Sequence, residues 1–60
     1  MNSKQQQLFD FFTAGNKLIQ SNNRLWMEGE VINTKTFQAV MRRIHPGNWV
    51  KHVNKYVTIK

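Results

Sequence analysis

Residues 33–47 read NTKTFQAVMRRIHPG, and they decide the fold because they hold the clearest helical pattern in the chain. Asn33 or Thr34 is suited to cap a helix, and apolar residues then recur at i, i+3, i+4 and i+7. These apolar residues are Phe37, Val40, Met41 and Ile44. Pro46 and Gly47 end the helix, since a residue before proline resists the helical conformation. The stretch predicts a helix over residues 34–44 with one face in the core.

The opposite face of this predicted helix is basic and carries no acid. At about 100° per residue, that face presents Lys35, Gln38, Ala39 and Arg42, with Arg43 on its flank. In the DNA major groove Arg reads guanine and Gln reads adenine through paired hydrogen bonds, while Ala permits close approach or contacts a thymine methyl. The helix N-terminal amides and Thr34 are suited to phosphate contacts. The pattern favours a recognition helix.

Charge is distributed unevenly along the chain. Residues 34–60 contain six Lys and Arg and no Asp or Glu, so they carry the whole net charge of +6. In residues 1–33 three basic residues balance three acidic ones. A one-sided basic surface on a small domain is typical of proteins that bind polyanions. Charge that serves only solubility would be spread more evenly.

The N-terminal segment predicts a second helix. Ser3 followed by Gln6 matches a capping box. The helix ends at Ala14, with Gly15 or Asn16 as a left-handed stop, or runs through Gly15 to about Gln20 at a cost of about 1 kcal/mol. Its apolar face comprises Leu8, Phe11 and Phe12, and in the longer version Leu18 and Ile19.

Residues 24–32 contain two short apolar runs separated by Glu28 and Gly29, after a turn-forming cluster at residues 21–23. The arrangement predicts a β-hairpin with its turn at the Glu-Gly pair. The competing interpretation is a short helix closed by Gly29, which would be the first helix of a helix-turn-helix.

Residues 49–60 are β-branched, aromatic and alternating. They predict a terminal β-hairpin with a two-residue turn at Asn54 and Lys55, or alternatively one long strand. A hairpin here would place cations beside the recognition helix like a wing. The phosphate-contacting residues expected in this tail are Lys51, Asn54, Lys55 and Lys60.

The order of helix, hairpin, basic helix and basic terminal hairpin resembles small winged-helix DNA-binding proteins, and among them the excisionases of phages and mobile elements. The segment that carries the resemblance runs from Arg24 to Phe37 and covers the hairpin and the start of the basic helix. The resemblance implies a protein that bends DNA, tunes recombination or acts as a compact repressor. The fold class expected is a single α+β, winged-helix-like domain over residues 1–60, with two or three helices and one or two β-hairpins.

The composition argues against several other classes of protein. There is no cysteine, so neither disulfides nor thiolate-bound zinc can stabilise the fold. His45 and His52 alone make a poor metal site, and no catalytic or cofactor-binding motif is present. We therefore expect no enzyme activity, no metal and no cofactor. Without an apolar run long enough for a signal peptide or a membrane span, a cytoplasmic protein is expected.

The favoured function is double-stranded DNA binding, as a regulator of transcription or a recombination accessory. Arg24 adds a contact from the central hairpin. Two copies are expected to pair, or to assemble cooperatively on DNA, because one small basic monomer would hold a single half-site weakly. One alternative is a module that binds a host protein through Phe9, Trp26 or Trp49. Another is an RNA or single-strand binder that stacks bases on Trp49 and Tyr56.

Overall fold

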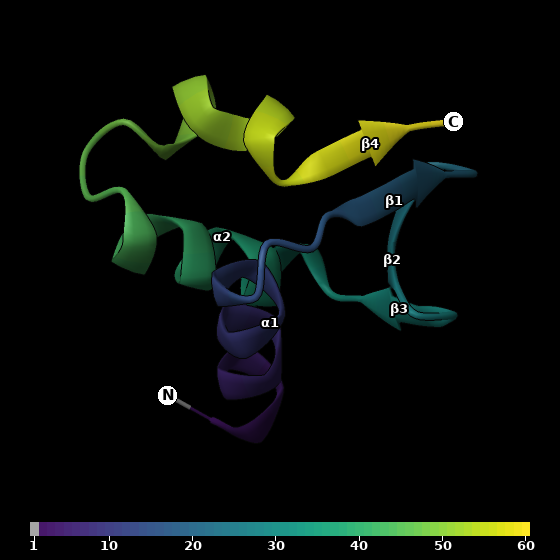
Figure 1. Ribbon diagram of the computed structural model, residues 1–60, viewed down its shortest axis with the longest axis horizontal. Helices are drawn as coiled ribbons and strands as arrows, with labels where there is room; N and C mark the ends of the chain where they lie inside the picture. The colour runs from purple at the N-terminus through teal and green to yellow at the C-terminus, as the bar shows by residue number, and fades with distance from the viewer. Residues whose placement is uncertain (1) are drawn as a thin grey trace.

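The computed structural model describes residues 2–60 and contains two α-helices, one 3₁₀ helix and a four-stranded mixed sheet (Figure 1). The elements, in chain order, are α1 (Ser3–Thr13), β1 (Leu18–Ser21), β2 (Arg24–Met27), β3 (Glu30–Ile32), α2 (Thr34–Ile44), the 3₁₀ helix η1 (Trp49–Lys55) and β4 (Val57–Ile59). The strand order is β3-β2-β1-β4, with β4 parallel to β1 and the other pairs antiparallel. The expected α+β class is confirmed, and the arrangement is compatible with a small winged-helix-like domain.

Helix α1 starts one residue earlier than the capping pattern predicted. The Asn2 side chain accepts a hydrogen bond from the Gln5 backbone N–H at 2.9 Å, and the Gln5 side chain accepts one from the Asn2 N–H at 3.3 Å. The Ser3–Gln6 box was therefore wrong by one position, because Asn and Ser are comparable N-caps and three successive glutamines can each supply the partner.

The shorter of the two predicted versions of α1 is correct. The helix closes at Ala14, and Gly15 follows with φ +89°, a left-handed conformation that glycine adopts without strain. Leu18 and Ile19 belong to β1 and do not extend the helix. The fully buried Leu18 side chain is contributed to the core from a strand.

Two tight turns build the antiparallel part of the sheet. Asn22 and Asn23 have φ of +55° and +61° and connect β1 to β2, so they form the two-residue turn that suits the twist of a hairpin. Glu28 and Gly29, with φ of +52° and +87°, connect β2 to β3 in the same way. The hairpin predicted over residues 24–32 is confirmed, and its helical alternative is wrong.

The C-terminal segment differs from both interpretations of its sequence. Residues 49–55 form η1, and only Val57–Ile59 adopt a strand, which pairs with β1. The terminal hairpin and the single long strand are therefore both wrong. Trp49 packs edge-to-face on Phe37 at 6.1 Å between ring centroids. Packing of this kind against α2 overrides the β propensity of the segment, since that propensity depends strongly on context.

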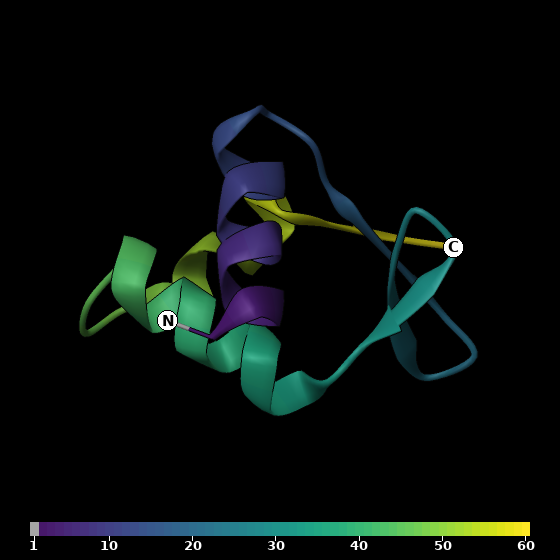
Figure 2. The same ribbon diagram turned by 90° about the horizontal axis from the view of Figure 1, so that it is seen from below.

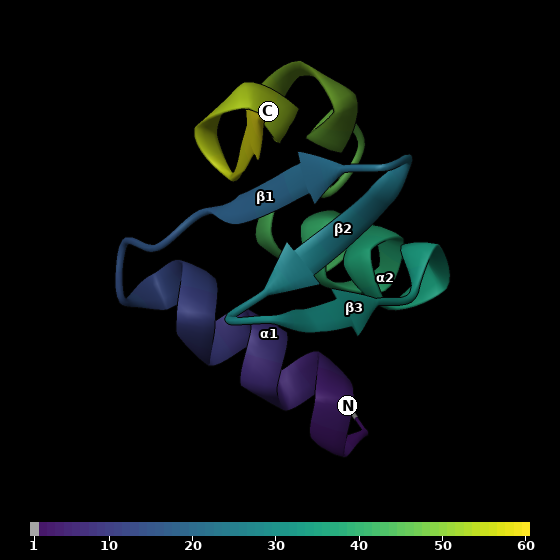
Figure 3. The same ribbon diagram turned by 90° about the vertical axis from the view of Figure 1, so that its right-hand side faces the viewer.

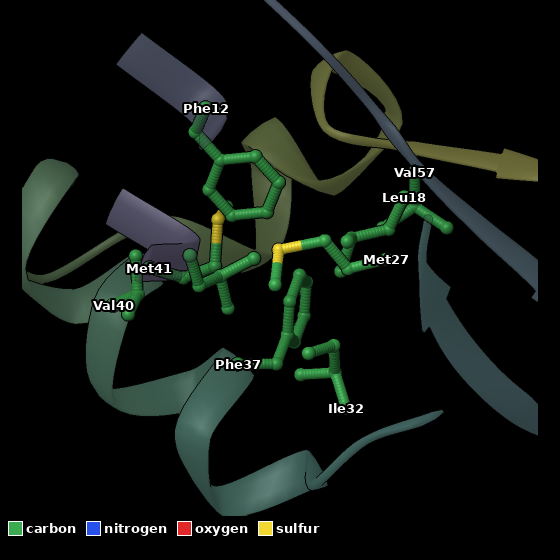
Figure 4. Close-up of a cluster of buried hydrophobic side chains, with 9 residues drawn as sticks. Phe12, Leu18, Met27, Ile32, Phe37, Val40, Met41 and Val57 are labelled. Carbon is green, nitrogen blue, oxygen red and sulfur yellow. The ribbon is translucent and has the colours of Figure 1, made fainter. Parts of the chain in front are cut away.

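Helix α2 matches its predicted bounds and carries the predicted core face. Phe37, Val40 and Met41 are buried and Ile44 is half-buried. Nine buried apolar side chains form one cluster between the helices and the inner face of the sheet (Figure 4). They are Leu8, Phe12, Leu18, Met27, Ile32, Phe37, Val40, Met41 and Val57.

Both α-helices lie on one side of the sheet. Figure 2 shows α1 crossing α2 steeply, with the strands at one end of the pair. Figure 3 views the other side of the sheet, where β1, β2 and β3 lie in front of α2. Within residues 2–60 no helix covers this outer face. No helix in the described residues has the length and apolar character that crossing a membrane requires.

Candidate nucleic-acid interface

The basic surface of α2 follows directly from the way this helix is anchored. Asn33 caps its start by accepting a hydrogen bond from the Lys35 N–H at 2.8 Å. Because the apolar side chains turn inward, Lys35 and Arg42 are exposed on the opposite face, with the half-buried Ala39 between them. Arg42 and Arg43 also stand in the last turn, where cations are favoured by the negative end of the helix dipole.

Gln38 does not lie directly opposite the core, as its position on a helical wheel suggested. It is half-buried and, with Thr34, lines a groove of about 370 Å³ between α2, the inner face of the sheet and η1. The outward face of α2 is therefore narrower than expected, and Gln38 borders it on the side of η1.

The 3₁₀ helix η1 packs along this same flank of α2. Its Val53 reaches the groove, whereas Lys51, Asn54 and Lys55 are exposed. The phosphate-contacting residues predicted in a hairpin are thus presented by a helix. Helix η1 contacts α2, and the candidate residues of these two helices are called here the α2–η1 surface. Its members are Thr34, Lys35, Gln38, Ala39, Arg42, Arg43, Lys51, Asn54 and Lys55.

A pair of histidines joins the two helices. The rings of His45 and His52 stack at 3.8 Å between centroids with planes 12° apart, and His45 Nε2 lies 3.0 Å from the Tyr56 hydroxyl oxygen. The pKa of His52 is lowered, first by burial and then by the neighbouring His45, Lys55 and Lys51. Its Nδ1 is buried with no hydrogen-bond partner among residues 2–60.

Two of the predicted basic contacts lie elsewhere. The Lys60 backbone N–H donates to the Gln20 carbonyl at 3.0 Å, which places Lys60 at the end of the sheet beside β1. Arg24 is an exposed residue at the start of β2 and lines the same groove as Thr34 and Gln38. Neither residue belongs to α2 or η1. Arg43 lines a hollow against α1 and lies at the border of the α2–η1 surface.

The acids gather at a different place from the cations. Asp10, Glu28 and Glu30 all line one hollow between α1 and the β2–β3 turn. The ion pair that the described residues contain joins Lys4 to Glu30 at 3.3 Å, and both side chains are exposed. Consequently no basic residue after position 33 is neutralised by an ion pair within residues 2–60. The separation of charge along the sequence is preserved in three dimensions.

The aromatic residues proposed for base stacking are used in packing. Trp49 is half-buried against Phe37, and Tyr56 packs on Phe12 with ring centroids 4.8 Å apart. Both rings are half-buried and have aromatic packing partners, and base stacking on them stays a prediction. Across the described chain no group of three or more His, Asp or Glu is placed to hold a metal ion.

The sequence analysis missed the outer face of the sheet. Cross-strand register aligns Val31, Trp26, Ile19 and Thr58 in one row across the four strands. Ile19 and Val31 are exposed by 40% and 47%, although both are large and apolar. The alternation of buried Leu18 with exposed Ile19 was the signal that could have revealed this face. The longer version of the predicted N-terminal helix included Leu18 and Ile19, and the shorter version gave them no strand.

The chain was compared with known proteins in three ways. No protein family matches it, and neither curated proteins nor solved structures include a significant match.

Proposed function

We propose that the protein binds double-stranded DNA through the α2–η1 surface, with α2 in the major groove. The observation that carries the proposal is the separation of charge: the basic residues after position 33 have no ion-pair partner within residues 2–60, and the three acids lie around a separate hollow. Unpaired cations on one surface attract a polyanion and release its counterions on binding.

The outward face of α2 supplies the contacts that can read bases. Lys35 and Arg42 are seven residues apart, which corresponds to about 10.5 Å along the helix axis, or about three base pairs at 3.4 Å each. Ala39 lies between them and leaves room for the edge of a base pair or a thymine methyl. Gln38 contributes from the border with the groove, where its amide can pair with adenine.

Phosphate contacts come from the flanks of this helix. Lys51, Asn54 and Lys55 on η1 take the place that a winged-helix protein gives to its wing, and Arg43 lies on the other flank. Contacts of this type position the protein without reading sequence. They also make affinity strongly dependent on salt.

The proposed role accords with the resemblance to excisionases, that is, a cytoplasmic DNA-binding protein that regulates transcription or assists recombination. Pairing of two copies, or cooperative assembly on neighbouring sites, would supply the affinity that one small helix lacks.

Fluorescence anisotropy with a labelled random duplex tests the proposal. We expect micromolar binding at low salt that weakens steeply at about 0.2 M salt, since counterion release dominates non-specific affinity. Unchanged affinity at the higher salt would indicate a mainly apolar interface. Absence of binding at low salt would overturn the proposal.

A further inference from the structure

The outer face of the sheet has the composition of a second binding surface. Its middle row places Trp26 between Val31 on β3 and Ile19 on β1, and Thr58 completes the row on β4. The Trp26 indole N–H donates to the Ser21 carbonyl at 3.0 Å, so the ring is held over the β1–β2 ladder. An aromatic ring fixed on an open sheet needs little ordering when a planar ligand stacks on it.

A second row on this face is basic. Ser21 pairs with Arg24, and the bond from the Lys60 N–H to the Gln20 carbonyl continues the β1–β4 ladder one residue further. Strand alternation therefore places Lys60, Ser21 and Arg24 side by side, on the same face as Trp26. The two rows are two residues apart, or about 6.6 Å, which is comparable with the reach from a base to its own phosphate.

We propose that this outer face binds single-stranded nucleic acid, with a base stacked on Trp26 and the backbone phosphates on Arg24 and Lys60. Aromatic rings beside cations are the usual means by which proteins hold single strands without sequence preference. The proposed contacts lie on the outer face of the sheet, whereas α2 packs against its opposite face (Figure 3). The two surfaces meet at one groove, which Arg24 and Val31 line together with Thr34 and Gln38.

The charge on this face argues against a second copy of the chain as its occupant. Two copies meeting face to face with like rows opposed would bring Arg24 and Lys60 of one close to the same residues of the other. The acid nearest in sequence to Arg24 is Glu28, which lies in the β2–β3 turn at the other end of β2. The phosphates of a nucleic acid would pair with Arg24 and Lys60, and its bases would contact the apolar row.

A single-tryptophan protein gives a direct test. In the Trp49→Phe variant the remaining indole is Trp26, and we expect a 12-nucleotide oligo(dT) to quench its emission. In the otherwise unchanged chain, Trp26→Leu should weaken oligo(dT) binding about tenfold, within the range measured for loss of one base–aromatic stack. Circular dichroism checks that both variants fold.

Exposed cations provide a test that does not depend on the core. Arg24→Gln combined with Lys60→Gln should reduce the salt slope of oligo(dT) binding by about 1.4, since each phosphate contact to a single strand contributes about 0.7. The matched control, Lys35→Gln with Arg42→Gln, removes the same charge from α2. It should leave this slope unchanged while weakening duplex binding.

The outcomes separate this inference from the proposed function. Quenching that persists in the α2 control supports the inference, even when duplex binding fails altogether. A parallel oligo(U) titration shows whether DNA or RNA is the preferred strand. Absence of quenching by both oligomers overturns the inference, as does a salt slope that responds only to the α2 pair. Trp26 emission that changes with protein concentration alone would assign the face to self-association instead.

Discussion

Neutralising the two lysines of η1 should change the salt dependence of duplex binding by a calculable amount. Lys51 and Lys55 are exposed, have no ion-pair partner within residues 2–60, and belong to η1, which contacts α2. In the proposed complex with duplex DNA they and Arg43 would make three phosphate contacts, and each contact contributes about −0.9 to the slope of log affinity against log salt. The slope expected for the unaltered protein is therefore about −2.7, and Lys51→Gln with Lys55→Gln should reduce it to about −0.9.

Anisotropy titrations of one random duplex at several salt concentrations measure these slopes. Between 50 and 200 mM salt the unaltered protein should lose about 40-fold in affinity, and the double variant about 3.5-fold. If Lys35 and Arg42 also displace counterions, both slopes become steeper, but their difference stays at about 1.8.

The matched control is Lys4→Gln with Lys17→Gln, which removes the same net charge from residues outside the α2–η1 surface. Its slope should equal that of the unaltered protein. Equal slopes for all three proteins would refute the assignment of phosphate contacts to η1. An equal reduction in both variants would show that net charge, and not the position of the lysines, controls binding.

Three further results are expected. Gln38→Ala or Arg42→Gln should relax base preference at one position of a selected duplex by about 1–3 kcal/mol, measured by competition with single-base variants; equal losses on specific and random duplexes would contradict base reading. The pKa of His52 is lowered from 6.5 in the folded chain, so as the pH falls the unfolded chain binds a proton at this imidazole first. The contribution of neutral His52 to stability is therefore complete above pH 6.5 and is lost as the pH falls through the lower pKa of the folded chain. Urea unfolding between pH 7.5 and 5.5 should show this loss, and His52→Gln should remove it; an unchanged pH dependence in that variant would contradict the assignment. Leu8→Ala removes a fully buried side chain and should cost about 2–5 kcal/mol of the roughly 3–9 kcal/mol available to a domain of this size. Thermal unfolding should then occur at least about 10 °C lower, and a fall no larger than that of the exposed control Gln7→Ala would show that this site tolerates the cavity.

The candidate site was predictable as far as it lies on one helix. The bounds of α2 and the exposure of Lys35 and Arg42 follow from a single amphipathic pattern, and the structure agrees with both. The position of Gln38 was not predictable, because it depends on η1 lying along that flank. Lys60 was predicted to flank α2 as part of a terminal hairpin, whereas its backbone pairs with β1 at the end of the sheet.

Local signals in the sequence determined the elements whose stabilising contacts join residues close together in the chain. A cap followed by a regular apolar period and a proline defines α2, and Glu28–Gly29 between two apolar runs defines the β2–β3 hairpin. In each case the deciding contacts join residues only a few positions apart. The charge separation is also a property of the sequence, and folding preserved it.

Tertiary structure decided the segments whose partners are distant in sequence. Leu18 and Ile19 form a strand because β2 and β4 pair with them on either side, and residues 49–55 form a helix because Trp49 and His52 pack on α2. Alternating β-branched residues are compatible with a strand or with a short helix. Which of the two forms depends on the surface against which the segment can bury its side chains. That surface exists only after the other elements have assembled, so no local pattern could reveal it.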